Sequence, residues 1–280
     1  MPRRTVAPAP KLRPDRVGPL RAEILCIGHA LLRGELSDQN ARPIARALLD
    51  RGCIVDRIAL VDSAETAVAA ALAETLRRNP NLVVTTGGLG PGAWDRTLAA
   101  VAKVLRLPLT LHSVAHDQIE RAYRRLHETG AVESAGLNLV REKVCRVPIG
   151  ATLVPNAVGI APGVVCRLTG GVAVVCLPGA GKEMRPMLEQ ALAVASELGG
   201  RVKFTRREVE AATADEASLV PMLERLATEF PDVHVGSRPA ASSGGKVIVT
   251  LETSAATEQY AESHIERAFK RLLALASGSR

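Results

Sequence analysis

A glycine-rich stretch at residues 82–97 carries the strongest chemical signal in the sequence. Residues 82–86 are apolar and β-branched, which predicts a buried strand. Gly87, Gly88 and Gly90 follow this strand within four residues. Glycine lets the backbone approach a ligand closely and adopt positive φ angles. A turn of this composition at the end of a strand therefore indicates a loop that binds a ligand through its backbone.

Asp95 and Thr97 stand where the next helix should begin, ahead of an apolar helical pattern at residues 98–105. A helix N-terminus presents free N–H groups and the positive end of the helix dipole, so it attracts phosphate and other anions. Asp95 has two interpretations, since an acid here can cap the helix or hold a cation that bridges phosphates. The spacing is neither that of a dinucleotide-binding fold nor that of a Walker loop. The alternative is a tight strand-to-helix connection without a ligand, but so many Gly and Pro residues before D-x-T favour a ligand loop.

The order T-G-G-L-G-P at residues 86–91, followed by Asp95 and Thr97, resembles the molybdopterin-binding domain family. This family includes the MoaB and MogA proteins of molybdenum-cofactor synthesis and the N-terminal domains of CinA and of eukaryotic FAD synthase. The CinA branch reads T-G-G-L-G-P-T-x-D-D-x-T. Here Gly92 replaces the Thr and Trp94 replaces the first Asp of that pattern.

Residues 22–40 resemble the start of the CinA branch, where G-[DN]-E-L-L-x-G precedes a D-x-N. Gly28, Asp38 and Asn40 match, whereas His29 and Ala30 replace an acid or amide and a Glu. The resemblance makes Asp38 the family's loop acid near the ligand. From the residues alone, the alternative is that Asp38 is a turn residue that caps the next helix.

Residues 148–163 and 172–184 resemble two further CinA motifs, P-x-G-A-x-x-x-x-N-x-x-G-x-A-P-G and L-P-G-x-P-x-E-M. The Asn156 side chain can form a hydrogen bond to the ring of a ligand, or only to the backbone of its own turn. Pro178 and Gly179 predict a second glycine turn at a strand end, ahead of a helix at 182–198. Glu183 lies in the first turn of that helix, where its negative charge interacts favourably with the positive end of the helix dipole.

The composition excludes several function classes. Net charge is +7, but the first 21 residues hold six basic side chains and one acidic one, so the remainder is nearly neutral. Only 2% of residues are aromatic. These features argue against a nucleic-acid groove, and no run reaches the length of a membrane span. Five cysteines without C-x-x-C spacing predict a reduced, cytoplasmic protein without a zinc site.

Strand and helix patterns alternate up to about residue 198, which predicts a three-layer α/β/α domain with a mostly parallel sheet. Ligands bind beyond the carboxyl ends of such strands, so Gly28 and the 87–90 turn should share one rim if their strands are neighbours. We expect a disordered basic tail at 1–20, this domain at 21–198, and a small β-α-β-β-α domain at 201–280. The expected helices and strands, in chain order, span residues 22–28, 40–51, 53–61, 65–78, 82–86, 98–105, 112–130, 132–143, 182–198, 202–211, 215–230, 233–238, 246–253 and 257–276, with a capping box at 62–65 and a hairpin turn at 242–245.

The resemblance implies a protein that binds a small phosphorylated pterin or nucleotide, such as molybdopterin, and that self-associates. It also implies metal-dependent hydrolysis of pyrophosphates such as ADP-ribose or FAD, with Asp95 and Asp38 as catalytic residues and ligands of Mg²⁺ or another divalent cation. Loss of acids at positions 29, 30 and 94 leaves two alternatives: a non-catalytic carrier or sensor for molybdenum-cofactor synthesis, and an interaction protein without a ligand. The expected ligand-binding residues are Gly28, Asn40, Gly87, Gly88, Leu89, Gly90, Trp94, Thr97, Asn156, Pro178 and Gly179.

Overall fold

A computed structural model describes residues 20–169, 171–195, 203–240, 245–255 and 257–277. The expected basic tail, apart from residue 20, and most of the expected hairpin turn lie outside these ranges. The chain divides into two compact units, a large N-terminal one and a small C-terminal one, at residues 199–200.

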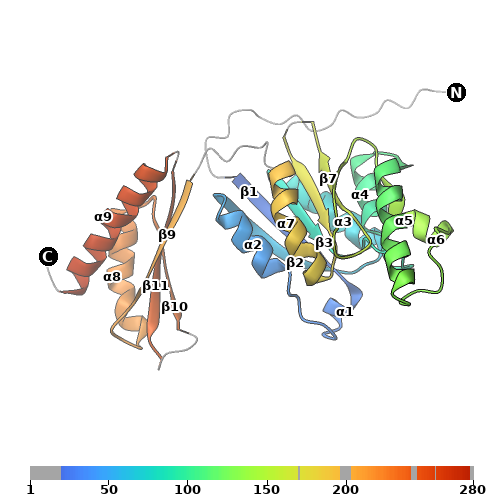
Figure 1. Ribbon diagram of the computed structural model, residues 1–280. Helices are drawn as coiled ribbons and strands as arrows, with labels where there is room; N and C mark the ends of the chain where they lie inside the picture. The colour runs from blue at the N-terminus through green and yellow to red at the C-terminus, as the bar shows by residue number, and fades with distance from the viewer. Residues whose placement is uncertain (1–19, 170, 196–202, 241–244, 256, 278–280) are drawn as a thin grey trace. The chain divides into compact units, whose positions relative to one another are not determined.

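The large unit is built on one six-stranded sheet with the strand order β2-β1-β3-β8-β7-β6 (Figure 1). The central strands β1, β3 and β8 run parallel, and β7 and β6 complete the sheet in antiparallel register. A two-stranded antiparallel pair, β4 with β5, lies outside this sheet. The elements of this unit are β1 (Leu20–Ile27), α1 (His29–Leu32), α2 (Ala41–Leu49), β2 (Cys53–Val61), α3 (Glu65–Arg77), β3 (Leu82–Thr86), α4 (Thr97–Leu105), β4 (Leu109–Leu111), α5 (Ser113–Glu128), α6 (Leu139–Glu142), the 3-10 turn η1 (Lys143–Cys145), β5 (Arg146–Pro148), β6 (Thr152–Val154), β7 (Gly163–Arg167), β8 (Ala173–Leu177) and α7 (Gly181–Ala195).

The sheet is covered on both faces, which confirms the predicted three-layer α/β fold. All residues of β3 and β8 are buried, as expected for strands that have helices above and below them. Figure 1 shows α2 and α7 on one face, with α3 and α4 on the other. All five cysteines are buried and unbridged, so they are part of this apolar core.

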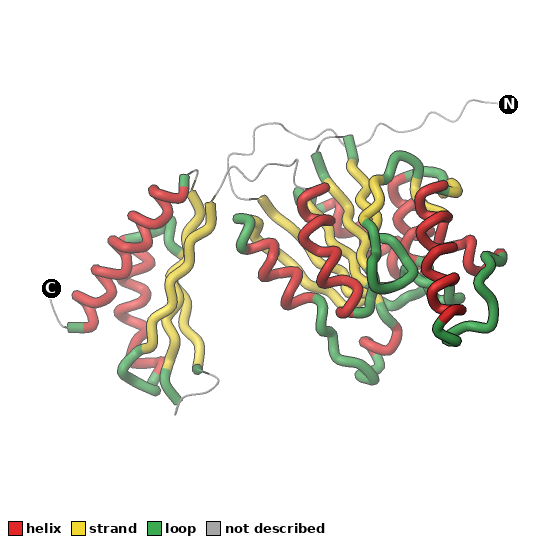
Figure 2. The backbone as a smooth tube through the Cα atoms, viewed as in Figure 1, coloured by secondary structure: helices red, strands yellow, loops and turns green. Residues whose placement is uncertain are grey.

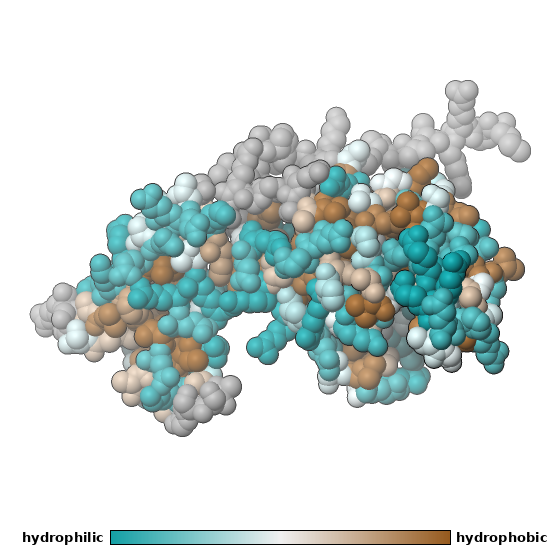
Figure 3. Space-filling view, viewed as in Figure 1, coloured by the Kyte–Doolittle hydropathy of each residue, from teal (hydrophilic) through white to brown (hydrophobic). Residues whose placement is uncertain are grey.

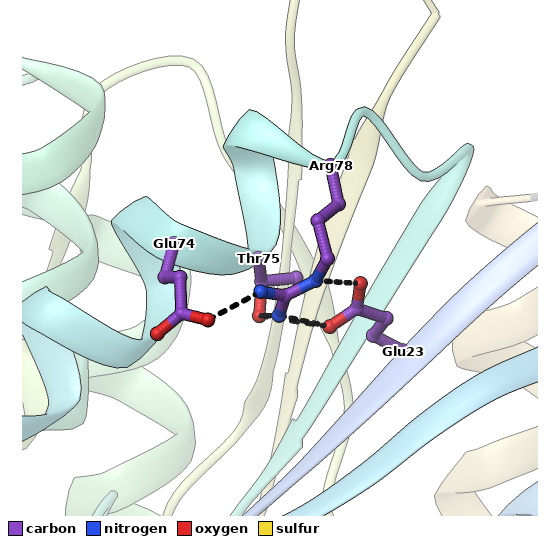
Figure 4. A network of polar contacts seen from close by, with 4 residues as sticks. All are labelled: Glu23, Glu74, Thr75 and Arg78. Carbon is purple, nitrogen blue, oxygen red and sulfur yellow. Dashed lines mark hydrogen bonds and ion pairs between the residues drawn. The ribbon is translucent and has the colours of Figure 1, made fainter.

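An ion pair between the buried Glu23 and the partly exposed Arg78 ties the start of β1 to the end of α3 (Figure 4). Glu23 is only 2% exposed, and its carboxylate accepts two hydrogen bonds from Arg78, of 2.7 Å from Nε and 2.6 Å from Nη2. The Thr75 hydroxyl donates a third bond of 3.1 Å to the same carboxylate, and Glu74 binds the outer side of the guanidinium. This two-pronged geometry holds the edge of the helical layer against the sheet.

Two local predictions are wrong. The predicted helix at 132–143 is mostly irregular, because Asn138 caps a new short helix, α6, through bonds to the N–H groups of Val140 and Arg141. The predicted capping box at 62–65 does not form either. The Asp62 carboxylate accepts a bond from the Ala64 N–H instead, and Ala64 is the residue that precedes α3.

The small unit packs a three-stranded antiparallel sheet, in the order β10-β11-β9, against two helices (Figure 2). Its elements are β9 (Lys203–Glu210), α8 (Glu216–Glu229), β10 (His234–Pro239), β11 (Val247–Ala255) and α9 (Glu258–Ala276). Asp215 and Thr257 cap the two helices through their side chains, which explains why polar residues begin both helical patterns. Leu226 and Leu251 lie in the core between the sheet and the helices.

Hydrophilic and hydrophobic residues are interspersed on the face of the larger unit seen in Figure 3. None of the described helices is both long and apolar enough to cross a membrane.

Candidate functional site

The three parallel strands end side by side, and the glycine turns follow directly. In the sheet register, Cys26 of β1 faces Thr86 of β3, and Thr86 faces Leu177 of β8. Gly28, Gly87 and Pro178 therefore lie at one rim, as parallel strands require. The Gly87 N–H donates to the Leu177 carbonyl over 2.9 Å, which joins the two turns.

Glycine is required in these turns because the backbones cross without room for a side chain. A Cβ on Gly87 would lie 2.1 Å from the Ile27 carbonyl oxygen, and one on Gly88 would lie 2.2 Å from the Thr97 hydroxyl. Both residues also have positive φ angles, of 100° and 69°. Gly179 packs against Gly87, with its missing Cβ 3.2 Å from the Gly87 Cα.

The rim opens into a cavity of about 620 Å³ that is lined by the glycine turns, the loop at 158–161 and one side of α5. The cavity has free donors on its wall. Among the described residues, the backbone N–H groups of Gly88, Leu89 and Gly90 donate to no protein acceptor. Arg125 and Lys182 also line it, and neither has an ion-pair partner in the described part of the chain. Free N–H groups beside two cations favour an anionic ligand.

Asp95 lines this cavity but also braces its own loop. Its carboxylate accepts a 2.9 Å bond from the Gly92 N–H, and the Lys143 amine donates a 2.5 Å bond to the Gly92 carbonyl. Burial lowers the pKa of Lys143, while the nearby Asp95 charge acts in the opposite direction. A Cβ on Gly90 would lie 2.7 Å from the Asp95 carboxylate, so Gly90 makes room for this acid.

Thr97 lies behind the glycine turn rather than in the cavity. It is fully buried, and its hydroxyl donates a 2.8 Å bond to the Gly87 carbonyl. Trp94 differs sharply, since it lines the cavity and is 72% exposed. An apolar side chain that pinned the loop to the next helix would be buried, which does not match this exposure.

A smaller cavity of about 360 Å³ lies beside the first and shares Gly28 and Gly179 with it. Asp38 lines it, but its oxygens accept bonds from the N–H groups of Asn40 and Ala41, of 3.3 Å and 2.9 Å. This carboxylate therefore caps α2. Burial, with Asp38 nearby, raises the pKa of the Cys26 thiol in this cavity to about 12.

Asn40 ties the two turns together at the wall of the smaller cavity. Its amide nitrogen donates to the Thr86 hydroxyl over 2.8 Å and to the Gly179 carbonyl over 2.7 Å. Its amide oxygen is buried and has no partner among the described residues. Asn40 therefore joins the two turns and leaves this buried acceptor unsatisfied.

Asn156 uses all of its amide within the protein. Its oxygen accepts bonds from the N–H groups of Val158 and Gly159, and its nitrogen donates to the Ala161 carbonyl and the Glu183 carboxylate. Asn156 therefore shapes the 156–161 loop that walls the larger cavity. Glu183 supports that loop in addition to its place in the first turn of α7.

His29 follows Gly28, which lines the larger cavity, and is held in place by the loop after β2. Its Nδ1 lies 2.8 Å from the Asp62 carboxylate, and its backbone N–H donates a 3.1 Å bond to the Ser63 hydroxyl. The bond with His29 is the main reason that the pKa of Asp62 lies below its usual range. The His29 ring is parallel to that of Trp94 within 8°, with centroids 6.3 Å apart.

The expected metal ligands are not assembled into one site. Asp38 and Asp95 line different cavities, and both carboxylates accept bonds from backbone N–H groups. Among the described residues, no three His, Cys, Asp or Glu side chains are grouped so that they could hold a metal ion. These residues do not fit a divalent cation held by the protein alone.

The sequence did not point to Arg125, Lys182 or the His29–Asp62 pair as site residues. Lys182 follows the second glycine turn directly, a signal that could have found it. Arg125 lies on an amphipathic helix far along the chain, and only the packing of α5 brings it to the cavity.

A family model described as "Probable molybdopterin binding domain" matches residues 23–196, which include every element that lines the two cavities. The chain belongs to this family. A protein of Pyrococcus furiosus is 36% identical over 218 residues, which cover 78% of this chain and 84% of the relative. A protein of Pyrobaculum aerophilum is 33% identical over 259 residues, or 91% of this chain and 93% of the relative.

Among solved structures, the protein CinA from Thermoplasma acidophilum, described as having unknown function, is 30% identical to this chain. The match covers 62% of this chain and 98% of that protein, with a TM-score of 0.56. These findings confirm the predicted family and its CinA-like branch. They make the chain a binding protein of the molybdopterin family that is related to molybdenum-cofactor synthesis.

Proposed function

We propose that this protein binds a phosphorylated pterin of the molybdopterin type in the larger cavity. The observation that carries the proposal is the row of free N–H groups at Gly88, Leu89 and Gly90 on the cavity wall. Such a row binds phosphate through the backbone. Arg125 and Lys182 supply positive charge to the same cavity, and about 620 Å³ is the volume of an ordinary small-molecule site.

We favour binding over pyrophosphate hydrolysis because the two expected catalytic acids have structural partners. Asp38 caps α2 and Asp95 braces the 92–95 loop. Hydrolysis would need charge stabilisation at a developing phosphate leaving group and a water held in line. Both carboxylates are engaged by the protein. They also line different cavities, so they are not directed at one point.

Titration calorimetry tests the proposal directly. The wild-type protein is titrated with molybdopterin, ADP-ribose, FAD and ATP, each with and without Mg²⁺ or Co²⁺. We expect molybdopterin to bind most tightly, without need of the cation. Lys182→Gln and Arg125→Gln should each weaken binding about tenfold, the loss of one charge-assisted contact of about 1.4 kcal/mol.

Arg124→Gln is the matched control for these variants, because Arg124 lies beside Arg125 on α5 but pairs with Glu120 outside the cavity. It should bind like the wild type. Equal affinities for all four ligands in the wild type and both cavity variants would refute the proposal. Release of phosphate or AMP from ADP-ribose would instead support the hydrolase alternative.

A further inference from the structure

The larger cavity combines two kinds of surface. One part suits an anion, through the free N–H groups of the 88–90 turn together with Arg125 and Lys182. The other part is apolar, since Trp94 and Val158 also line the cavity and are 72% and 54% exposed. Exposed apolar side chains at a binding cavity indicate a surface that a ligand covers. A ligand that fits both parts carries an anionic group joined to an apolar or flat one.

The exposure of Trp94 is not explained by packing within the protein. Trp94 is the only tryptophan of the chain, and the CinA pattern has an acid at this position. An indole ring usually buries much of its area in a folded protein. Here the His29 ring lies parallel to it, with centroids 6.3 Å apart, and the tryptophan is still 72% exposed. Most of the indole surface is therefore open to contact with a ligand.

The loop that carries Trp94 is held in place by bonds that do not involve the indole. The Asp95 carboxylate accepts a 2.9 Å bond from the Gly92 N–H, and the Lys143 amine donates a 2.5 Å bond to the Gly92 carbonyl. Because these bonds order the loop before a ligand arrives, the ligand does not have to order it, and this lowers the cost of binding.

We propose that Trp94 is a specificity-determining residue, whose indole stacks through one face on the planar heteroaromatic ring of a phosphorylated ligand. This inference rests on the proposed function, because the same ligand would place its phosphate at the free N–H groups of Gly88–Gly90. A pterin and an adenine both present such a ring. An anion without a ring, such as pyrophosphate, uses only the anion-binding part of the cavity and gains nothing from the indole.

The first test compares ring-bearing and ring-free probes by calorimetry on the full chain. The probes are molybdopterin, ADP-ribose and inorganic pyrophosphate, and the variants are Trp94→Ala and Trp94→Phe. Trp94→Ala should weaken the binding of the ring-bearing probes about tenfold, at the lower end of what one stacked ring contributes. Trp94→Phe should recover most of this loss, because phenylalanine keeps an aromatic face. Pyrophosphate affinity should be the same in all three proteins.

The second test uses fluorescence, because the single tryptophan makes the emission specific to Trp94. Quenching by acrylamide is measured on the wild type alone, then saturated with the tighter-binding ring-bearing probe, and then saturated with pyrophosphate. The ring-bearing probe should lower the quenching constant by about half, because a stacked ring covers one of the two faces of the indole. Pyrophosphate should leave the quenching constant unchanged.

Tyr260→Ala is the matched control, since Tyr260 is an exposed aromatic residue that lies outside both cavities. It should bind all three probes like the wild type. All variants should keep the wild-type melting temperature, because the replaced rings are exposed. The relative affinities of molybdopterin and ADP-ribose show which ring the site prefers.

The two proposals fail in different ways. If the wild type binds molybdopterin and Trp94→Ala binds it equally well, the ring contact is refuted while the proposed function stands. If Trp94→Ala weakens pyrophosphate binding as much as molybdopterin binding, the side chain supports the loop rather than a ligand ring, and the contact is again refuted. If the wild type binds none of the probes, both the contact and the proposed function are overturned.

Discussion

Arg78→Ala should destabilise the large unit strongly, because it leaves a buried carboxylate without its charged partner. Glu23 is 2% exposed and would keep only the Thr75 hydroxyl. Removing one member of a buried ion pair costs about 3–5 kcal/mol. Since 33% of the Arg78 side chain is exposed, we expect the lower end, about 3 kcal/mol. For a unit of this size, that loss lowers the melting temperature by about 6–12 °C.

Calorimetric melting and urea unfolding, followed by far-ultraviolet circular dichroism on the full chain, measure this loss. Arg77→Ala is the matched control, because the neighbouring Arg77 is exposed and should change stability by less than about 0.5 kcal/mol. Glu23→Leu combined with Arg78→Met should recover most of the stability, since an apolar pair of similar volume often replaces a buried ion pair at little cost. A loss below about 1 kcal/mol for Arg78→Ala would refute the reasoning.

Three further predictions concern other parts of the chain. Asp95→Ala should cost about 1 kcal/mol in urea unfolding, the loss of its bond to the Gly92 N–H; a fall in molybdopterin affinity without this loss would mean that the carboxylate contacts the ligand instead. The Cys26 thiol has a raised pKa of about 12 in the folded protein, so its contribution to stability is complete below its ordinary pKa of about 8.5 and disappears as pH rises toward 12. At pH 9 the native protein should therefore react slowly with a thiol reagent at Cys26, and rapid labelling there would contradict the burial. Deleting residues 1–19 should leave melting temperature and ligand affinity unchanged, and a large drop in either would show that the tail packs on the body.

The fold could be predicted from local patterns because the elements that carry it are strongly periodic. The apolar runs of β1, β3 and β8 are typical of strands that are buried on both faces of a sheet, and the glycine turns mark the ends of these strands. The helix expected at 132–143 failed for a local reason. Asn138 competes for the backbone N–H groups of the following residues and starts a new, shorter helix.

The site was less predictable because several of its groups come from distant elements. The motif near residue 90 lies on the wall of the larger cavity. It carried no information about Arg125, which depends on how α5 packs, or about the bond between His29 and Asp62, which joins residues 33 positions apart. Asp38 and Asn156 illustrate the opposite case, in which the sequence points to a residue that the protein uses for its own structure. Their residue types suit a ligand, but the structure engages their side chains in its own turns.

The departures from the CinA pattern lie in and beside the two cavities: Trp94 lines the larger one, Ala30 lines the smaller one, and the His29 ring lies parallel to that of Trp94. Where that pattern has acids or an amide, this chain has His29, Ala30 and Trp94, so negative charge is removed and two rings are introduced. The backbone donors of the 88–90 turn do not depend on those side chains and are retained. A site changed in this way keeps its means of holding a phosphate and loses carboxylates that would bind a cation. The loss of these carboxylates favours a binding protein over a metal-dependent hydrolase.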